Sequence, residues 1–264
     1  MAAIYPDQTL VSDFAPASAP LLALEQVSFA YAQSTPLVTD FTWRIAPGAR
    51  WAILGPSGSG KTTLLYLLAG LRKPTAGVIL HDGQPLLKPN PQIGLMLQAY
   101  GLLPWFTARQ NIHTGLQIRG LPANERRERA DRWLKRLEID HLADQFPGQL
   151  SGGQRQRVAL ARLLALESRT LLLDEPFSAV DELTRERLQL RLRALQAELG
   201  STLVLVTHSV EEAVLLADHI LIITNFAPIT NATVLHSPFN GTPPRRDDPA
   251  FTAFCRRIRD ILQL

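Results

Sequence analysis

Short apolar segments recur along the chain and alternate with segments of helical period. Residues 51–54 and 171–173 are continuously apolar, and 201–207 has an apolar centre, which is typical of strands buried on both faces. One predicted helix face ends at Gly200 and carries Leu188, Leu192, Leu195 and Leu199. Because buried strands alternate with helices, the pattern predicts an α/β fold with a covered parallel sheet.

The remaining segments depart from this alternation. Residues 22–31 and 41–45 predict strands near the N-terminus, and residues 219–224 predict the last strand of the core. Residues 108–165 are mostly helical in pattern and rich in arginine. Residues 1–20 end in Ala-Pro-Ala-Ser-Ala-Pro, which predicts a flexible tail. We therefore expect a helical insertion within an α/β core.

Composition says more about the compartment than about the function. The chain has 264 residues, a formal net charge of +3 and one cysteine, Cys255, so no disulfide can form within it. The best candidate membrane segment, residues 93–106, is broken by polar residues, glycine and proline and is shorter than the roughly 18 residues needed to cross a bilayer. The N-terminus lacks the basic start of a signal peptide. These features predict a cytoplasmic protein.

A glycine-rich segment between the strand at 51–54 and the next predicted helix matches the phosphate loop G-x-x-x-x-G-K-[ST]. In such a loop, backbone N–H groups surround the phosphates. Lys61 can reach the β- and γ-phosphates, and the Thr62 hydroxyl can bind Mg²⁺. A glycine-rich turn without a ligand is the alternative. The expected ATP-binding residues here are Gly55, Pro56, Ser57, Gly58, Ser59, Gly60, Lys61, Thr62 and Thr63.

Two adjacent acids, Asp174 and Glu175, follow the apolar strand at 171–173. An acid at the tip of such a strand can hold Mg²⁺ directly or through water. The next acid can polarise a water molecule for attack on the γ-phosphate. An acidic pair that only ends a strand is the alternative, but a phosphate loop in the same sheet favours the catalytic interpretation.

Residues 150–157 read Leu-Ser-Gly-Gly-Gln-Arg-Gln-Arg, in which Ser151 is a natural helix N-cap. This stretch resembles the signature motif of ABC (ATP-binding cassette) ATPases, and the resemblance extends over residues 22–224. It implies a P-loop NTPase core with an inserted helical subdomain and an N-terminal antiparallel β portion. It also implies a dimer in which the signature of each subunit, formed by Ser151, Gly152, Gly153 and Gln154, faces the ATP of its partner. We expect a homodimer, and a pair of two different cassettes is the alternative.

The resemblance assigns roles to other positions as well. Tyr31 matches the aromatic residue that stacks on adenine, although a core tyrosine is an alternative. Gln98 matches the glutamine that senses Mg²⁺ and the attacking water, and His208 matches the histidine that contacts the γ-phosphate. Residues 178–181 match a loop that crosses the dimer interface. The implied catalytic set is Glu175, His208, Gln98 and Lys61, and the implied Mg²⁺ ligands are Thr62, Gln98 and Asp174.

We expect three regions: a tail at 1–20, the ATPase domain at 21–240 with its helical subdomain near 99–166, and a C-terminal helical extension at 241–264. One cassette without a membrane span favours an importer with a separate integral-membrane permease and, indirectly, a solute-binding protein. The segment Leu-Leu-Pro-Trp at 102–105 resembles nitrate, sulfonate and taurine importers.

This interpretation places the chain on the cytoplasmic face of the inner membrane. In the family, a permease helix docks beside the glutamine loop, here residues 98–107, and we expect its apolar residues Tyr100 and Trp105 to form an exposed docking surface. Burial of Trp105 in the core is the alternative. A non-transport ABC ATPase acting on nucleic acid or the ribosome is the competing function, but the chain lacks inserted coiled coils and zinc cysteines, so we expect no nucleic-acid partner.

Overall fold

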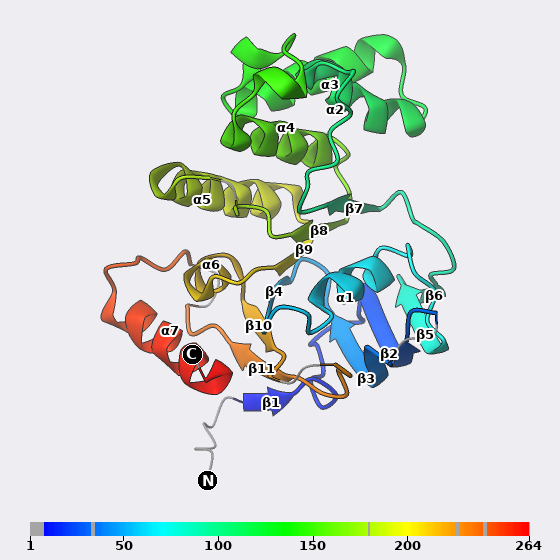
Figure 1. Cartoon of the computed structure of the whole chain (residues 1–264), viewed down its shortest axis with the longest axis vertical. Helices are drawn as coiled ribbons and strands as arrows, with labels where there is room; N and C mark the ends of the chain where they lie inside the picture. The colour runs from blue at the N-terminus through cyan, green and yellow to red at the C-terminus, as the bar shows by residue number, and fades with distance from the viewer. Residues whose placement is uncertain (1–7, 33–34, 179, 225–226, 240–241, 264) are drawn as a thin grey trace.

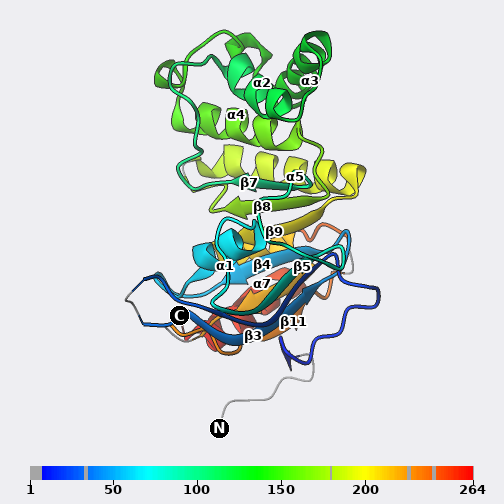
Figure 2. The same cartoon turned by 90° about the vertical axis from the view of Figure 1, so that its right-hand side faces the viewer.

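The computed structural model describes residues 8–32, 35–178, 180–224, 227–239 and 242–263. Within these residues, two β-sheets and their covering helices form one part of the molecule, and a helical layer lies at the opposite end (Figure 1). The view turned by 90° shows the same separation (Figure 2). This arrangement confirms the α/β fold with an inserted helical layer.

The larger sheet has the strand order β1-β11-β10-β4-β9-β8-β7. In the described part of this sheet, five consecutive strands that include one of its edges run parallel, as the continuously apolar segments predict. They are β4 (Arg50–Leu54), β7 (Ile93–Met96), β8 (Thr170–Asp174), β9 (Thr202–Val206) and β10 (His219–Ile222). Since the carboxyl ends of parallel strands meet at one edge, the loops after β4, β7, β8 and β9 converge there.

The antiparallel edge of this sheet contains part of the segment that the sequence predicts to be a flexible N-terminal tail, so that prediction is wrong for this part. Strand β1 (Gln8–Leu10) pairs with β11 (Thr233–His236). Beyond β1, Val11 is buried, and the ring of Phe14 packs edge-on against Trp51 with centroids 5.1 Å apart. Residues 8–14 of the expected tail therefore belong to the fold, because β11, over 200 residues away, supplies the hydrogen bonds of β1 and Trp51 packs against Phe14. Residues 1–7 lie outside the described part of the chain.

A second, antiparallel sheet has the order β3-β2-β5-β6. Its strands are β2 (Leu22–Phe29), β3 (Val38–Ile45), β5 (Ala76–His81) and β6 (Gln84–Pro85). Buried side chains of β2 and β3 join those of β4 in one core, where Trp43 and Trp51 meet edge to face at 5.3 Å. This sheet is the N-terminal antiparallel portion that the resemblance implies.

In the part of the chain that the structure describes, four helices complete the α/β part of the molecule. Helix α1 (Lys61–Leu68) packs on β8 and β9, and α6 (Val210–Leu216) packs on β4. Helix α5 (Glu182–Leu199) contacts α6, and α7 (Pro249–Leu262) packs on the other side of α6. Among the residues that the structure describes, no helix is both long and apolar enough to cross a membrane.

The helical layer lies between β7 and β8 in the chain. It consists of α2 (Ala108–Ile118), α3 (Ala123–Arg136), α4 (Gly152–Leu164) and the 3₁₀ turns Asp140–Leu142 and Pro147–Gln149. Its apolar faces meet around the buried side chains of Trp133 and Leu134.

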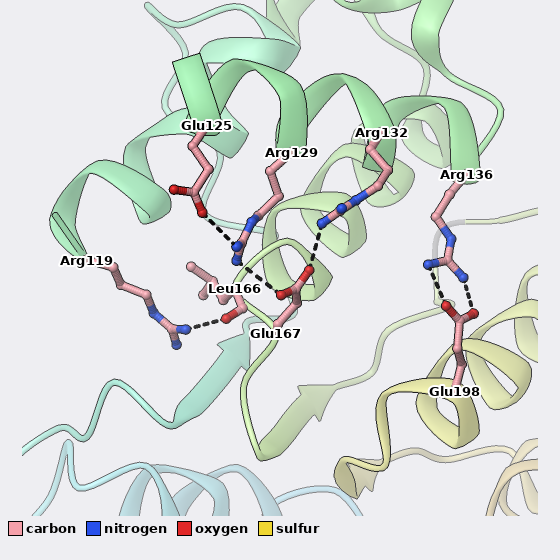
Figure 3. A network of polar contacts seen from close by, with 8 residues as sticks. All are labelled: Arg119, Glu125, Arg129, Arg132, Arg136, Leu166, Glu167 and Glu198. Carbon is pink, nitrogen blue, oxygen red and sulfur yellow. Dashed lines mark hydrogen bonds and ion pairs between the residues drawn. The ribbon is translucent and has the colours of Figure 1, made fainter. Parts of the chain in front are cut away.

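Arginines join this layer to the elements below it (Figure 3). Arg129 and Arg132 of α3 pair with Glu167, which follows α4, at 3.2 and 2.8 Å. Arg136 pairs with Glu198 of α5, and Arg119 at the end of α2 donates to the carbonyl oxygen of Leu166. The arginine-rich sequence thus forms ion pairs between layers as well as a solvated surface.

Candidate functional site

The phosphate loop lies between the end of β4 and the start of α1. Its Gly60 has φ +91°, a conformation that favours glycine, and a Cβ on Gly55 would come within 2.6 Å of the Ile223 carbonyl oxygen. The loop curls around the Lys61 ammonium group, whose Nζ donates to the carbonyl oxygens of Gly55 and Pro56 at 2.9 and 2.7 Å. The two glycines are therefore required by the shape of the loop itself.

Two further features of this loop suit an anion. Helix α1 begins without a side-chain cap, so its first N–H groups have no side-chain partner and its positive dipole end faces the loop. The Ser59 side chain is fully buried, and its Oγ has no hydrogen-bond partner among the described residues. Backbone N–H groups, an ammonium group and a hydroxyl together form the donor set that binds phosphates.

The carboxyl edge of the sheet brings together the polar residues that the sequence places far apart. The Thr62 hydroxyl donates to Asp174 Oδ1 at 3.2 Å. Gln98 Nε2, just after β7, donates to Glu175 Oε2 at 2.9 Å, and His208 Nδ1, after β9, lies 3.7 Å from the same oxygen. The structure therefore gathers the catalytic and metal-binding candidates at one edge.

Burial changes the acid–base properties of this cluster. Desolvation raises the pKa of Asp174, although the hydrogen bond from Thr62 opposes the shift. Desolvation also lowers the pKa of Lys61, while the nearby Glu175 and Asp174 oppose that change. Both shifts arise because the site holds charges away from solvent, where their effect on a bound phosphate is greater than in water.

Tyr31 lies beside the phosphate loop and is only partly buried. Its hydroxyl is 3.4 Å from Thr63 Oγ1, its ring packs edge-on against Phe29, and the Arg72 guanidinium lies 5.3 Å from the ring centroid. The ring is therefore placed next to the start of α1 without being enclosed in the core. This geometry fits an aromatic contact to a nucleotide base, and that role stays a prediction.

The signature residues lie in the helical layer, at the start of α4. Ser151 caps the helix by accepting a hydrogen bond from Gln154 N, and Gln154 Oε1 accepts one from Ser151 N. In both views α4 lies in the helical layer, whereas α1 lies on the sheet (Figures 1 and 2). The signature, whose Ser151 is exposed and whose Gly152, Gly153 and Gln154 are half-buried, therefore lies in a different layer from the phosphate loop of its own chain.

The segment after Glu175 leads directly into α5. Ser178 Oγ donates to the carbonyl oxygen of Glu175 at 3.1 Å, and the Asp181 side chain caps α5 by accepting from Thr184 N. Ala179, which belongs to the expected interface loop, lies outside the described residues. Glu212, which the sequence did not indicate as a site residue, accepts through its carboxylate a hydrogen bond from Thr207, next to His208. A single acid on a short helix carries no sequence signal of such a contact.

The loop after β7 divides into a buried and an exposed part. Tyr100 is only 8% exposed and belongs to the core, so the expectation that it lies on a docking surface is wrong. Trp105 is 66% exposed, so the alternative of a core Trp105 is wrong as well. Arg162 of α4 holds the buried part by donating to the carbonyl oxygens of Tyr100 and Gly101.

Comparisons with known proteins agree with this geometry. The family model described as ABC transporter matches residues 38–178. The chain is 40% identical over 245 residues to a taurine import ATP-binding protein of Chromobacterium violaceum, covering 90% of this chain and 94% of that protein. It is 39% identical over 225 residues to a nitrate transport protein of Klebsiella oxytoca, covering 84% and 80%.

A solved structure shows the same fold. It is a dimeric ATP-binding cassette in a post-hydrolysis state bound to ADP and Pi, with a TM-score of 0.70, 32% identity, and coverage of 76% of this chain and 94% of that one. These relatives are ABC proteins, and the two sequence matches are transport proteins, which does not favour the nucleic-acid or ribosome alternative. The chain belongs to the ABC transporter family, in its group of nitrate, sulfonate and taurine importers, and it is an ATP-binding and ATP-hydrolysing subunit.

Proposed function

We propose that this ATPase drives uptake of a small oxyanion, a sulfonate or nitrate, through a separate membrane permease. The observation that carries the proposal is the convergence of Lys61, Asp174 and Glu175 with Gln98 and His208 at one sheet edge. The solute class rests on the similarity to taurine and nitrate transport proteins. In this proposal the chain binds the cytoplasmic face of the membrane through its permease.

Mg²⁺ fits the oxygen atoms at this edge. The Thr62 hydroxyl and the Asp174 carboxylate lie 3.2 Å apart, and the Gln98 side-chain amide lies close by through its hydrogen bond to Glu175. Hydroxyl, carboxylate and amide oxygens are ligands that Mg²⁺ accepts. When bound, the ion neutralises charge on the β- and γ-phosphates.

Glu175 and His208 supply the chemistry around the γ-phosphate. Glu175 accepts a proton from the attacking water, and Gln98 orients its carboxylate. His208 lies 3.7 Å from the same carboxylate oxygen and stabilises the charge that develops on the transferred phosphoryl group. The Lys61 ammonium exchanges its loop carbonyl partners for phosphate oxygens.

The permease docks on the helical layer, where two adjoining hollows of about 240 and 750 Å³ share Gly115, Ile118 and Leu166. Ile118 is 83% exposed, and Trp105 lies exposed before the other end of α2. Exposed large apolar side chains mark interaction surfaces. A short amphipathic permease helix is the occupant that fits such a groove, which helices α2 and α4 line together with β7 and the segment before it.

Uptake in cells that lack the native gene tests this function. Cells carrying the wild-type chain should accumulate labelled taurine or labelled nitrate, and cells carrying Glu175→Gln should not. The double variant Trp105→Glu, Ile118→Glu should hydrolyse ATP as an isolated subunit but support no uptake, since only docking is removed. Uptake of neither solute by the wild-type chain would refute the solute class. Normal uptake by the double variant would place the docking surface elsewhere.

A further inference from the structure

Glu212 is a buried carboxyl group that contacts Thr207, the residue before His208. It lies in the first turn of α6 and is only 5% exposed. Its Oε2 accepts a hydrogen bond from Thr207 Oγ1 at 3.0 Å, while its Oε1 has no hydrogen-bond partner among the described residues. A buried carboxyl with one unpartnered oxygen lowers stability, so packing alone does not account for this side chain.

Glu212 closes a ring of hydrogen bonds around the residues that flank His208. Thr207 Oγ1, which donates to Glu212, accepts from Ser209 N at 3.0 Å. Ser209 Oγ in turn accepts from Glu212 N at 3.2 Å and caps α6. The His208 side chain itself is 69% exposed, with Glu175 3.7 Å away. The backbone on either side, held by this ring, therefore decides where the imidazole points.

Charged groups from three other elements face Glu212. They are Arg185 of α5, Arg246 before α7 and Glu175 after β8. Arg185 also donates to the carbonyl oxygen of Val180, in the loop that leads from Glu175 into α5. A hollow of about 30 Å³, lined by Glu175, His208 and Glu212 among others, lies between the two carboxyl groups. Glu212 thus borders the reaction site without being part of the phosphate loop.

We propose that Glu212 is a positioning residue for ATP hydrolysis, whose carboxyl group acts through Thr207 to aim His208 at the γ-phosphate. This inference rests on the proposed role of His208. The cap of α6 uses the Glu212 backbone N–H and the Ser209 hydroxyl, so removing the carboxyl leaves the helix start intact. Burial raises the pKa of Glu212 to about 7, which makes its protonation sensitive to pH near neutrality.

Steady-state kinetics of the purified full chain test the proposal. Glu212→Ala should lower kcat for ATP about 10- to 100-fold, because a shift of about 1 Å in a catalytic group has this effect. KM and ATP affinity should stay within about threefold, since no proposed ATP-binding residue is altered. Glu212→Gln keeps an acceptor for Thr207 and should retain most of the activity while flattening the pH profile of kcat between pH 6 and 8.

Two further variants separate positioning from folding. Thr207→Val removes the hydroxyl and should lower kcat as Glu212→Ala does, and the double variant should lose no more than either single one. Glu138→Ala, which removes the ion pair of an exposed acid with Arg191 outside this ring, is the control and should keep wild-type kcat. If Glu212→Ala does not fold, kcat of Thr207→Val and the pH profile of Glu212→Gln still test the positioning role.

Three results would overturn the proposal: wild-type kcat in folded Glu212→Ala, additive losses in the double variant, or an unchanged pH profile in Glu212→Gln. These outcomes are distinct from failure of the proposed function. If Glu175→Gln abolishes hydrolysis and the Glu212 and Thr207 variants do not, the ATPase assignment stands and the positioning role fails. If His208→Ala keeps full activity, the proposed role of His208 is wrong, and the positioning role of Glu212, which rests on it, is wrong as well.

Discussion

Asp174 and Glu175 are adjacent carboxylates that the fold places in different surroundings. Asp174 ends β8, is only 4% exposed and receives a hydrogen bond from Thr62. Glu175 has left the strand with φ 47°, and its side chain meets Gln98 and His208. A positive φ at a non-glycine residue is strained and recurs at functional sites. The turn thus points the two neighbouring carboxylates at different partners, which fits the proposed roles of Asp174 toward Mg²⁺ and of Glu175 toward the attacking water.

Glu175→Gln should lower ATP turnover by roughly 10²- to 10⁴-fold, because an amide cannot accept the proton of the attacking water. ATP binding should persist, since the phosphate loop is unchanged. Phosphate release and nucleotide affinity, measured on the same preparation, separate the two effects. Glu182→Gln, at the exposed start of α5, is the control and should keep wild-type turnover. Turnover near wild type in Glu175→Gln would remove Glu175 from the role of general base.

Glu212 should also make stability depend on pH. Its pKa is raised from an ordinary value of 4.5 to about 7 in the folded chain. Between these values the folded protein holds a proton that the unfolded chain has released, so the free energy of unfolding falls as pH rises through this window. Glu212→Gln lacks this contribution. Denaturant titrations at pH 5 and 7.5 should show that the free energy of unfolding falls less between these pH values in the variant than in the wild type. An equal fall in both proteins would contradict a raised pKa for Glu212.

At the scale of elements, the sequence predicted the helices, strands and loops that a motif or an apolar pattern within a few residues identifies. The phosphate loop, the strand ending at Asp174 and the helix capped by Ser151 each combine a motif with the right flanking pattern. Strand β1 gave no such signal, because three residues carry no measurable period and β11 supplies its pairing from far along the chain. Tyr100 and Trp105 could not be told apart either, since a loop has no period that marks its buried side.

The N-terminal segment is the element whose contribution is easiest to measure. Phe14 covers Trp51 and also packs against His219 and His236, with centroids 5.3 and 5.6 Å away. Phe14→Ala should lower the free energy of unfolding by about 2 kcal/mol, less than for a fully buried ring.

Urea denaturation followed by tryptophan fluorescence measures both the stability change and the new exposure of Trp51, which should shift the native emission to longer wavelength. Ser12→Ala, at an exposed neighbour, should change stability by less than about 0.5 kcal/mol. Equal stability in Phe14→Ala and Ser12→Ala would restore the interpretation of this segment as a loose tail.

At the scale of the whole molecule, the ATP-site candidates are divided between two parts. The phosphate loop and the acids lie at the sheet edge, whereas Ser151 and its glycines lie in the helical layer. The exposed cap of α4 offers N–H groups and a helix dipole to an anion. One chain carries both halves of an ATP site, but the two halves lie apart. A second copy placed head to tail would therefore complete two ATP sites, each with a phosphate loop from one chain and a signature from the other.

This division predicts how two variants behave alone and together. In a Glu175→Gln background, which preserves bound ATP, the parent chain should dimerise on addition of ATP. Lys61→Ala should not dimerise on addition of ATP, because it loses a contact to the phosphates. Ser151→Arg should bind ATP as a monomer but fail to dimerise, since its side chain blocks the partner's site.

Mixing the two variants is the stronger test, because only a shared site predicts recovery. A mixed dimer has one site with Lys61 from the Ser151→Arg chain and Ser151 from the Lys61→Ala chain, both intact, and one site with both defects. ATP should therefore restore part of the dimer in the mixture, although neither variant dimerises alone. Size-exclusion chromatography with light scattering measures the dimer fraction. Full dimerisation of Ser151→Arg by itself, or no recovery on mixing, would show that the two halves do not meet across a dimer interface.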